Sequence, residues 1–148
     1  MDCYLMRHGE TLSGVPDGRR ALSERGRSAV TALAQRAMAR GVVVAWIYHS
    51  GILRAQQTAE LVAEVLTPAA GVRQLAGLCP DDDPFIVQAE LAAASQPIML
   101  VSHLPYIGRL ASLLTSGDSG GSMIEFAPAT LVCLTRHTGG WKLSWSMR

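Results

Sequence analysis

The chain has little charge, few cysteines and no long apolar segment. Charged residues make up 17% of its 148 residues and the formal net charge is +1, so the sequence offers no electrostatic basis for binding nucleic acid or a membrane surface. No apolar run reaches the roughly 18 residues that a membrane span needs. The first hydrophobic segment follows no basic, cleavable leader. We therefore expect a cytoplasmic protein with neither nucleic-acid nor membrane partners.

Metal and disulfide sites also have little support in the sequence. The three cysteines, Cys3, Cys79 and Cys133, are far apart and lack the CxxC spacing of zinc and redox sites. Free, largely buried thiols are the state that this pattern favours. The four histidines have no i,i+3 or i,i+4 spacing that would place two metal ligands on one helix face. The sequence thus predicts neither a metal nor another cofactor.

Hydrophobic residues, by contrast, make up 49% of the chain, enough for a single domain over 1–148 to bury most of a sheet. Short apolar runs alternate with segments of helical periodicity. The expected helices cover 24–40, with Ser23 as N-cap, 53–66, with Ser50 as cap, 84–94 and 105–114. The expected strands cover 3–6, 42–48, 72–75, 98–101, 122–126, 130–135 and 141–146.

The order of these elements predicts the fold class. Strands that alternate with helices and are apolar on both faces are typical of parallel sheets covered on each side. The last segments lack helices between them, and Gly139 and Gly140 suit a hairpin turn. We therefore expect a three-layer α/β/α sandwich with a mostly parallel sheet and an antiparallel edge strand.

Basic side chains follow three of the expected strands. Arg7 and His8 end the first strand, Arg54 lies in the first turn of the helix after the second, and His103 comes directly after the strand over 98–101. Because the carboxyl ends of parallel strands share one edge of the sheet, we expect these side chains to converge. A desolvated guanidinium needs an anionic partner, and its planar fork binds phosphate oxygens in pairs. The set therefore suits a phosphoryl group.

Four segments in this order resemble the motifs of the histidine phosphatase superfamily, which includes phosphoglycerate mutases. They are residues 7–9 (Arg-His-Gly), 22–26, 50–58 and 101–103. Gly51 stands where that family usually has proline. Residues 102–105 (Ser-His-Leu-Pro) and 78–80 (Leu-Cys-Pro) further resemble the small SixA-type phosphohistidine phosphatases. The resemblance covers essentially the whole chain and implies a phosphoglycerate mutase-like fold.

The resemblance also implies a phosphatase mechanism. His8 would be the nucleophile that takes the phosphoryl group and forms a phosphohistidine intermediate. Arg7, Arg54 and His103 would bind the phosphoryl oxygens and stabilise their charge in the transition state. His8 must be neutral to attack, so we expect its cationic neighbours to lower its pKa and a hydrogen bond from its other ring nitrogen to fix the tautomer.

The proton donor is where the family pattern weakens. Mutase-like members carry a glutamate after the third strand that protonates a leaving alcohol, and Gly77 stands in the corresponding stretch. Glu10, Asp81, Asp82 and Asp83 are the candidate substitutes, although the three aspartates also form a helix-capping run. General acid catalysis contributes about 10²–10⁴-fold to departure of an alkoxide. Imidazole, with a pKa near 6.5, leaves readily without it.

Three functions follow from these residues. The first is a phosphatase for protein phosphohistidine, such as a phosphotransfer domain, because residues 50–94 leave little room for a lid and the pocket is expected to be open. The second is a phosphatase for a small phosphomonoester that uses one of the candidate acids. The third is a phosphate-binding module without turnover, against which the intact set of two arginines and two histidines counts.

Overall fold

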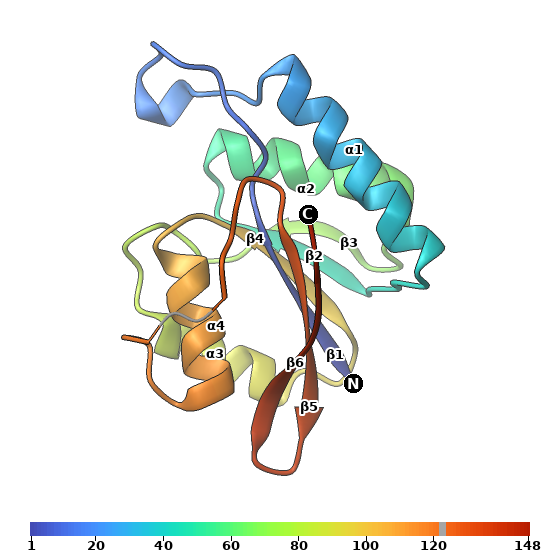
Figure 1. Cartoon of the computed structure of the whole chain (residues 1–148), viewed down its shortest axis with the longest axis vertical. Coiled ribbons are helices and arrows are strands. Elements are labelled where there is room, and N and C mark those ends of the chain that lie inside the picture. The colour runs from blue at the N-terminus through green and yellow to red at the C-terminus, as the bar shows by residue number, and fades with distance from the viewer. Residues whose placement is uncertain (122–123) are drawn as a thin grey trace.

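The computed structural model describes residues 1–121 and 124–148 as one six-stranded sheet with helices on both faces (Figure 1). The strands are β1 (Asp2–Arg7), β2 (Trp46–His49), β3 (Gly71–Gln74), β4 (Ile98–Ser102), β5 (Leu131–His137) and β6 (Gly140–Met147). The helices are α1 (Glu24–Ala39), α2 (Leu53–Leu66), α3 (Pro84–Ala93) and α4 (Tyr106–Ser116), with the short 3₁₀ helix η1 (Asp17–Arg19) between β1 and α1.

The sheet is parallel over four strands and antiparallel over two. Its order is β3-β2-β4-β1-β5-β6. β1 pairs in parallel with β4, and β2 pairs in parallel with β3 and β4, whereas β5 runs antiparallel to both β1 and β6. The first four strands therefore end at one edge, which is where open α/β sheets place their ligand sites.

Two apolar cores, one on each face of the sheet, hold the layers together. α1 and α2 bury Val30, Leu33 and Val62 against one face. α3 and α4 bury Leu91 and Ile107 against the other, and Figure 1 shows the two helix pairs on opposite sides of the strands. Each fully buried aliphatic side chain of this kind contributes about 1.5–3 kcal/mol. The expected three-layer sandwich is confirmed.

Local signals placed the helix boundaries well. Ser23 accepts a hydrogen bond from the Gly26 N–H and caps α1. Asp83 accepts one from the Phe85 N–H and caps α3, with Pro84 in the first turn. In the part of the chain that the structure describes, no helix has the length and apolar character needed to span a membrane.

Three expectations about individual elements are wrong. Ser50 is not the N-cap of α2: the helix begins at Leu53 with Ile52 as N-cap, and the Ser50 hydroxyl, two residues earlier, accepts the Ile52 N–H and contacts His103. Residues 42–45 are not strand: Val42 and Val44 enter the core, but Val43 is 75% exposed and pairing begins only at Trp46. The expected strand over 122–126 is absent at 124–126, and residues 122 and 123 lie outside the described residues.

Candidate active site

Strand register brings the two predicted histidines together. Arg7, the last residue of β1, pairs with Ser102, the last residue of β4, and His8 and His103 directly follow the two strands. Their ring centroids lie 5.1 Å apart with an interplanar angle of 55°. His8 is 7% exposed and His103 is 1% exposed, so the carboxyl edge of the sheet holds two buried imidazoles in contact distance.

The hydrogen bonds of His8 determine which ring nitrogen is reactive. Its Nδ1 lies 2.8 Å from the carbonyl oxygen of Gly9. A carbonyl can only accept, so Nδ1 carries the proton and the lone pair is on Nε2. Burial, opposed by the Gly9 hydrogen bond and helped by the charges of Arg54, Arg7 and Arg20, lowers the pKa of His8 to about 4. At neutral pH the ring is therefore uncharged, with its lone pair on Nε2.

Ser50 sets the tautomer of His103, which is the same as that of His8. The Ser50 hydroxyl accepts from the Ile52 N–H at 3.2 Å and lies 2.6 Å from Nε2 of His103. The hydroxyl proton is thus available to Nε2, which leaves the ring proton on Nδ1. Nδ1 is buried without a hydrogen-bond partner among the described residues. Burial, together with nearby His8 and Arg54, lowers the pKa of His103 to about 3.

Each of the two predicted arginines donates a hydrogen bond through one terminal nitrogen of its guanidinium group, and its Nε has no partner among the described residues. Arg54, the second residue of α2 and 4% exposed, donates through Nη1 to the main-chain oxygen of Asp17 at 3.2 Å. Arg7 donates through Nη1 to the carbonyl of Phe126 at 3.0 Å. In both, Nε is buried and lacks a partner in the described part of the chain. Burial is the main cause that lowers the pKa of each.

Two charged residues of the site were missed by the sequence reasoning. Asp17 of η1 lies 3.1 Å from Nη2 of Arg20 and 3.6 Å from Nη2 of Arg54. The i,i+3 spacing of Asp17 and Arg20 in the polar loop is the signal that was available. It indicates only a local ion pair, because the path of the loop over α2 is a tertiary feature.

Three of the four candidate acids hold local structure. Glu10 accepts two hydrogen bonds from Arg25, at 2.7 and 3.0 Å, and this pairing lowers its pKa. Asp82 accepts from the Cys79 N–H at 2.8 Å, and Asp83 is the α3 cap. Asp81 is exposed. Glu10 is therefore a paired carboxylate, and Asp82 and Asp83 order the loop from β3 to α3.

Two glycines mark where the chain departs from the family pattern. Gly77 has φ of +97°, and a β-carbon there would lie 3.2 Å from Cγ2 of Val87 on α3. A side chain at that position would be strained and directed at α3. Gly51 has φ of +88°, a value that the proline ring excludes. Both loops therefore follow backbone paths that the usual family residues do not adopt.

Taken together, the site can receive a tetrahedral oxyanion. Arginine Nε–H groups and the Nδ1–H of His103 are buried donors, and the Nε2 lone pair of His8 lies beside them. Donors fixed in a dry site stabilise developing negative charge without reorganisation. Within residues 1–121 and 124–148, no group of three or more His, Cys, Asp or Glu side chains is arranged to hold a metal ion.

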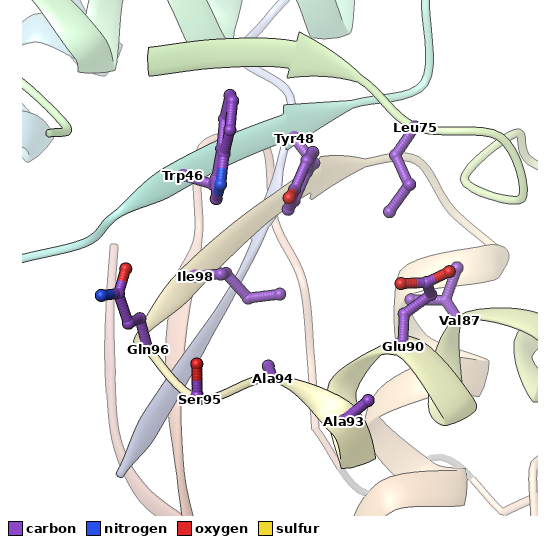
Figure 2. A pocket seen from close by; sticks show the side chains of 10 residues that line it. All are labelled: Trp46, Tyr48, Leu75, Val87, Glu90, Ala93, Ala94, Ser95, Gln96 and Ile98. Atoms are coloured by element: carbon purple, nitrogen blue, oxygen red, sulfur yellow. The ribbon is translucent and has the colours of Figure 1, made fainter. Parts of the chain in front are cut away.

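A separate cavity of about 230 Å³ lies on the α3 face of the sheet (Figure 2). Trp46 and Tyr48 project into it from β2, with their rings stacked 5.5 Å apart. Ile98 of β4 and Glu90 of α3 line it from the other sides. Among the described lining residues, Glu90 is the one that carries a charge, and it is exposed. None of the two arginines and two histidines of the candidate active site lines this cavity.

Similarity to known proteins agrees with this geometry. The model of the histidine phosphatase superfamily (branch 1) matches residues 3–79. Phosphohistidine phosphatase SixA of Escherichia coli (strain K12) is 28% identical over 152 residues, covering 99% of this chain and 93% of that protein. An uncharacterized protein of a Picosynechococcus species is 34% identical over 128 residues, covering 81% and 76%.

Among solved structures, the protein histidine phosphatase SixA complexed with tungstate superposes with a TM-score of 0.89 at 27% identity, covering 99% of this chain and 96% of that one. The matched segment contains Arg7, His8 and Arg54, and the structural match extends over the remainder, including His103. The chain therefore belongs to the histidine phosphatase superfamily and is a phosphatase.

Proposed function

We propose that the protein removes phosphoryl groups from phosphohistidine side chains of another protein, by way of a phosphohistidine on His8. The observation that carries this proposal is the state of His8: a buried, neutral imidazole with its Nε2 lone pair directed away from the Nδ1–Gly9 hydrogen bond. Such a ring beside buried cations is a nucleophile for phosphorus.

The reaction has two displacements. In the first, Nε2 of His8 forms a bond to phosphorus as the bond from phosphorus to the substrate nitrogen breaks, and the substrate ring, protonated on its other nitrogen, takes the electron pair and leaves as neutral imidazole. In the second, water attacks the phosphorus of phospho-His8, the electron pair of the phosphorus–nitrogen bond returns to Nε2, and both protons of the water leave with the phosphate product. Phosphoryl transfer of this kind depends mainly on positioning and on stabilising the equatorial oxygens.

Arg7, Arg54 and His103 are proposed to bind those oxygens. The free Nε edges of the two guanidinium groups offer paired donors to phosphoryl oxygens. Nδ1–H of His103 supplies a further donor. A bound dianion would also raise the pKa of His103 from its value near 3, which moves this residue toward a charged donor as the phosphoryl group arrives.

The need of the leaving group for a proton donor distinguishes an alkyl phosphate from a phosphohistidine as the substrate. Glu10 is held as a carboxylate by Arg25, and a side chain at Gly77 would be directed at α3. An alkyl phosphate needs an acid at this point, whereas imidazole departs without one. Between β3 and α3 there is only the short loop over 75–83, so this part of the chain supplies no lid. Both features favour a phosphohistidine that projects from a protein surface, such as a phosphotransfer domain.

Similarity supports the same substrate class. The relative from E. coli is described as a phosphohistidine phosphatase. The related structure holds tungstate, an oxyanion with the tetrahedral shape of phosphate. The alternative, a phosphatase for a small phosphomonoester, would draw its acid from Glu10 or from one of the three aspartates at 81–83.

The test compares leaving groups on one enzyme. Turnover of a phosphohistidine peptide is measured beside phosphoserine peptide, a sugar phosphate and p-nitrophenyl phosphate, with His8→Ala as the inactive control. We expect kcat/KM for phosphohistidine to exceed that for the two alkyl phosphates by about 10²-fold or more. A tenfold preference for an alkyl phosphate would contradict the proposed substrate. Binding of inorganic phosphate without any turnover would leave only the phosphate-binding module.

A further inference from the structure

A third arginine, Arg20, lies beside Arg54 in the site. One carboxylate contacts both: Asp17 Oδ1 is 3.1 Å from Nη2 of Arg20, and Asp17 Oδ2 is 3.6 Å from Nη2 of Arg54. Because the two oxygens belong to a single carboxyl group, the two guanidinium groups are neighbours. Arg54 is almost fully buried and Arg20 is half-buried, with 34% of its side chain exposed.

The backbone holds Arg20 in this place at both ends of its loop. Thr11 and Leu22 form an antiparallel bridge that closes the loop after β1. The Leu22 N–H donates to Oε1 of Gln57 on α2 at 2.9 Å, which ties the loop to the helix that carries Arg54. Figure 1 shows this loop as the blue segment between β1 and α1. Arg20 is two residues from the bridge, so its position follows from anchored backbone.

All three arginines of the site share one arrangement. Terminal nitrogens are tied to a protein acceptor: Arg7 to the Phe126 carbonyl, Arg54 and Arg20 to Asp17. Nε of each is buried and has no partner among the described residues. A buried N–H without an acceptor is costly, and such groups in native proteins nearly always find one. The side of a guanidinium that contains Nε and one Nη binds two oxygens of a phosphoryl group.

The charge of Arg20 also reaches the reactive groups. It contributes to lowering the pKa of both His8 and His103, as Arg7 and Arg54 do. An exposed ion pair at i,i+3 with Asp17 would contribute little to stability by itself. The arrangement of Arg20 is therefore better explained by a role in the site than by a role in holding the loop.

From this geometry we propose that Arg20 is a third phosphoryl-binding arginine, which donates its Nε–H to the bound phosphoryl group, and that Asp17 positions it beside Arg54. The inference rests on the proposed placement of the phosphoryl group between the arginines and histidines. In this role Arg20 contributes to binding of the phosphoryl group.

The test uses inorganic phosphate as the probe, because its binding does not require turnover. Calorimetry and competitive inhibition give its affinity for the wild type, Arg20→Met, Arg20→Lys and Arg19→Met. Arg19 is exposed on the same loop, so its variant removes the same charge without touching the site. We expect Arg20→Met to weaken phosphate binding and raise KM by about 10- to 100-fold, and Arg19→Met to change either by less than about twofold.

The remaining outcomes separate this inference from the proposed function. Arg20→Lys keeps the charge but lacks the Nε–H, so most of the loss should remain; full recovery by lysine would show that charge alone acts and would overturn the inference. Equal behaviour of Arg20→Met and Arg19→Met would overturn it too. If Arg20→Met raised KM for the protein substrate but left phosphate binding unchanged, Arg20 would contact a part of the substrate other than the phosphoryl group, and the proposal would be wrong. Failure of the wild type itself to bind phosphate would instead contradict the proposed function.

Discussion

The candidate active site and the cavity on the α3 face differ in the state of their polar groups. The cavity is lined by stacked Trp46 and Tyr48, by aliphatic residues and by the exposed carboxylate of Glu90. The site at the sheet edge instead holds buried cations whose Nε–H groups have no acceptor among the described residues. Buried polar groups are expensive unless they are paired. Of the six buried side-chain atoms without a partner in the described part of the chain, four belong to arginines and a histidine of the candidate site, and this concentration distinguishes the site from the cavity.

The largest effect is expected for a substitution of His8 in the candidate active site. Replacing His8 by alanine removes the nucleophile, and we expect kcat to fall by about 10³-fold or more. Steady-state turnover of a phosphohistidine peptide measures this, with thermal unfolding as the check on folding. Turnover within tenfold of the wild type would mean that another group attacks phosphorus.

Arg54 and Arg73 provide a matched pair of arginines from the two regions. Arg54 is 4% exposed in the site, whereas Arg73 lies over the Trp46 ring at 5.7 Å. Loss of one buried donor to a developing oxyanion costs about 10²–10³-fold. We expect that loss in kcat/KM for Arg54→Met and less than about twofold for Arg73→Met. Equal effects of the two substitutions would remove the distinction between the regions.

The pH dependence of kcat/KM tests the environment of His8. Its pKa is lowered to about 4, so the neutral form persists as the pH falls and activity is lost only as the pH approaches that value. With a histidine pKa of 6.5, the neutral fraction and hence kcat/KM would fall about 25-fold between pH 7 and pH 5. After correction for substrate ionisation near pH 6, we expect kcat/KM to fall by less than about threefold between pH 7 and pH 5. An acid limb near pH 6.5 would show that His8 is not desolvated.

Removing the candidate acids should have small effects. Glu10 is paired with Arg25 and Asp82 accepts from the Cys79 N–H, so both act on loop structure. For the phosphohistidine peptide, kcat should fall less than about fivefold in Glu10→Gln and in Asp82→Asn, since imidazole needs no acid to leave. A hundredfold loss in kcat with unchanged KM, in either variant, would identify that residue as the proton donor.

The smallest effect is expected in the cavity itself. Tyr48→Phe and Glu90→Gln alter the polar groups at its wall without reaching the sheet edge. Turnover and phosphate binding should stay within about twofold of the wild type in both variants. A larger change in kcat with an unchanged unfolding temperature would show that the two regions are coupled.

Much of this site could be predicted from the sequence because a topological rule places it. Arg7, His8, Arg54 and His103 follow three strands, and parallel strand ends share one edge whatever the loops do. In the structure the ring centroids of His8 and His103 lie 5.1 Å apart. Helix caps such as Ser23 and Asp83 were also predictable, since they depend on hydrogen bonds to residues two or three positions away.

The remaining features depend on contacts between distant loops. Ser50 looked like a helix cap, yet its hydroxyl is bonded to His103, 53 residues further along. The path of the loop after β1 decides that Asp17 and Arg20 reach Arg54. Backbone φ at Gly77 decides where a side chain would point. No local pattern encodes these three facts, because each is fixed by tertiary packing.

The central claim is that His8 itself carries the phosphoryl group during turnover. Rapid acid-free quenching of the enzyme with a phosphohistidine substrate, followed by mass spectrometry of its peptides, tests this most directly. We predict a phosphoryl group on the peptide containing His8, lost in acid, retained in alkali and absent in His8→Ala. An acid-stable phosphoryl group on a serine or an aspartate, or an adduct that persists in His8→Ala, would contradict the account.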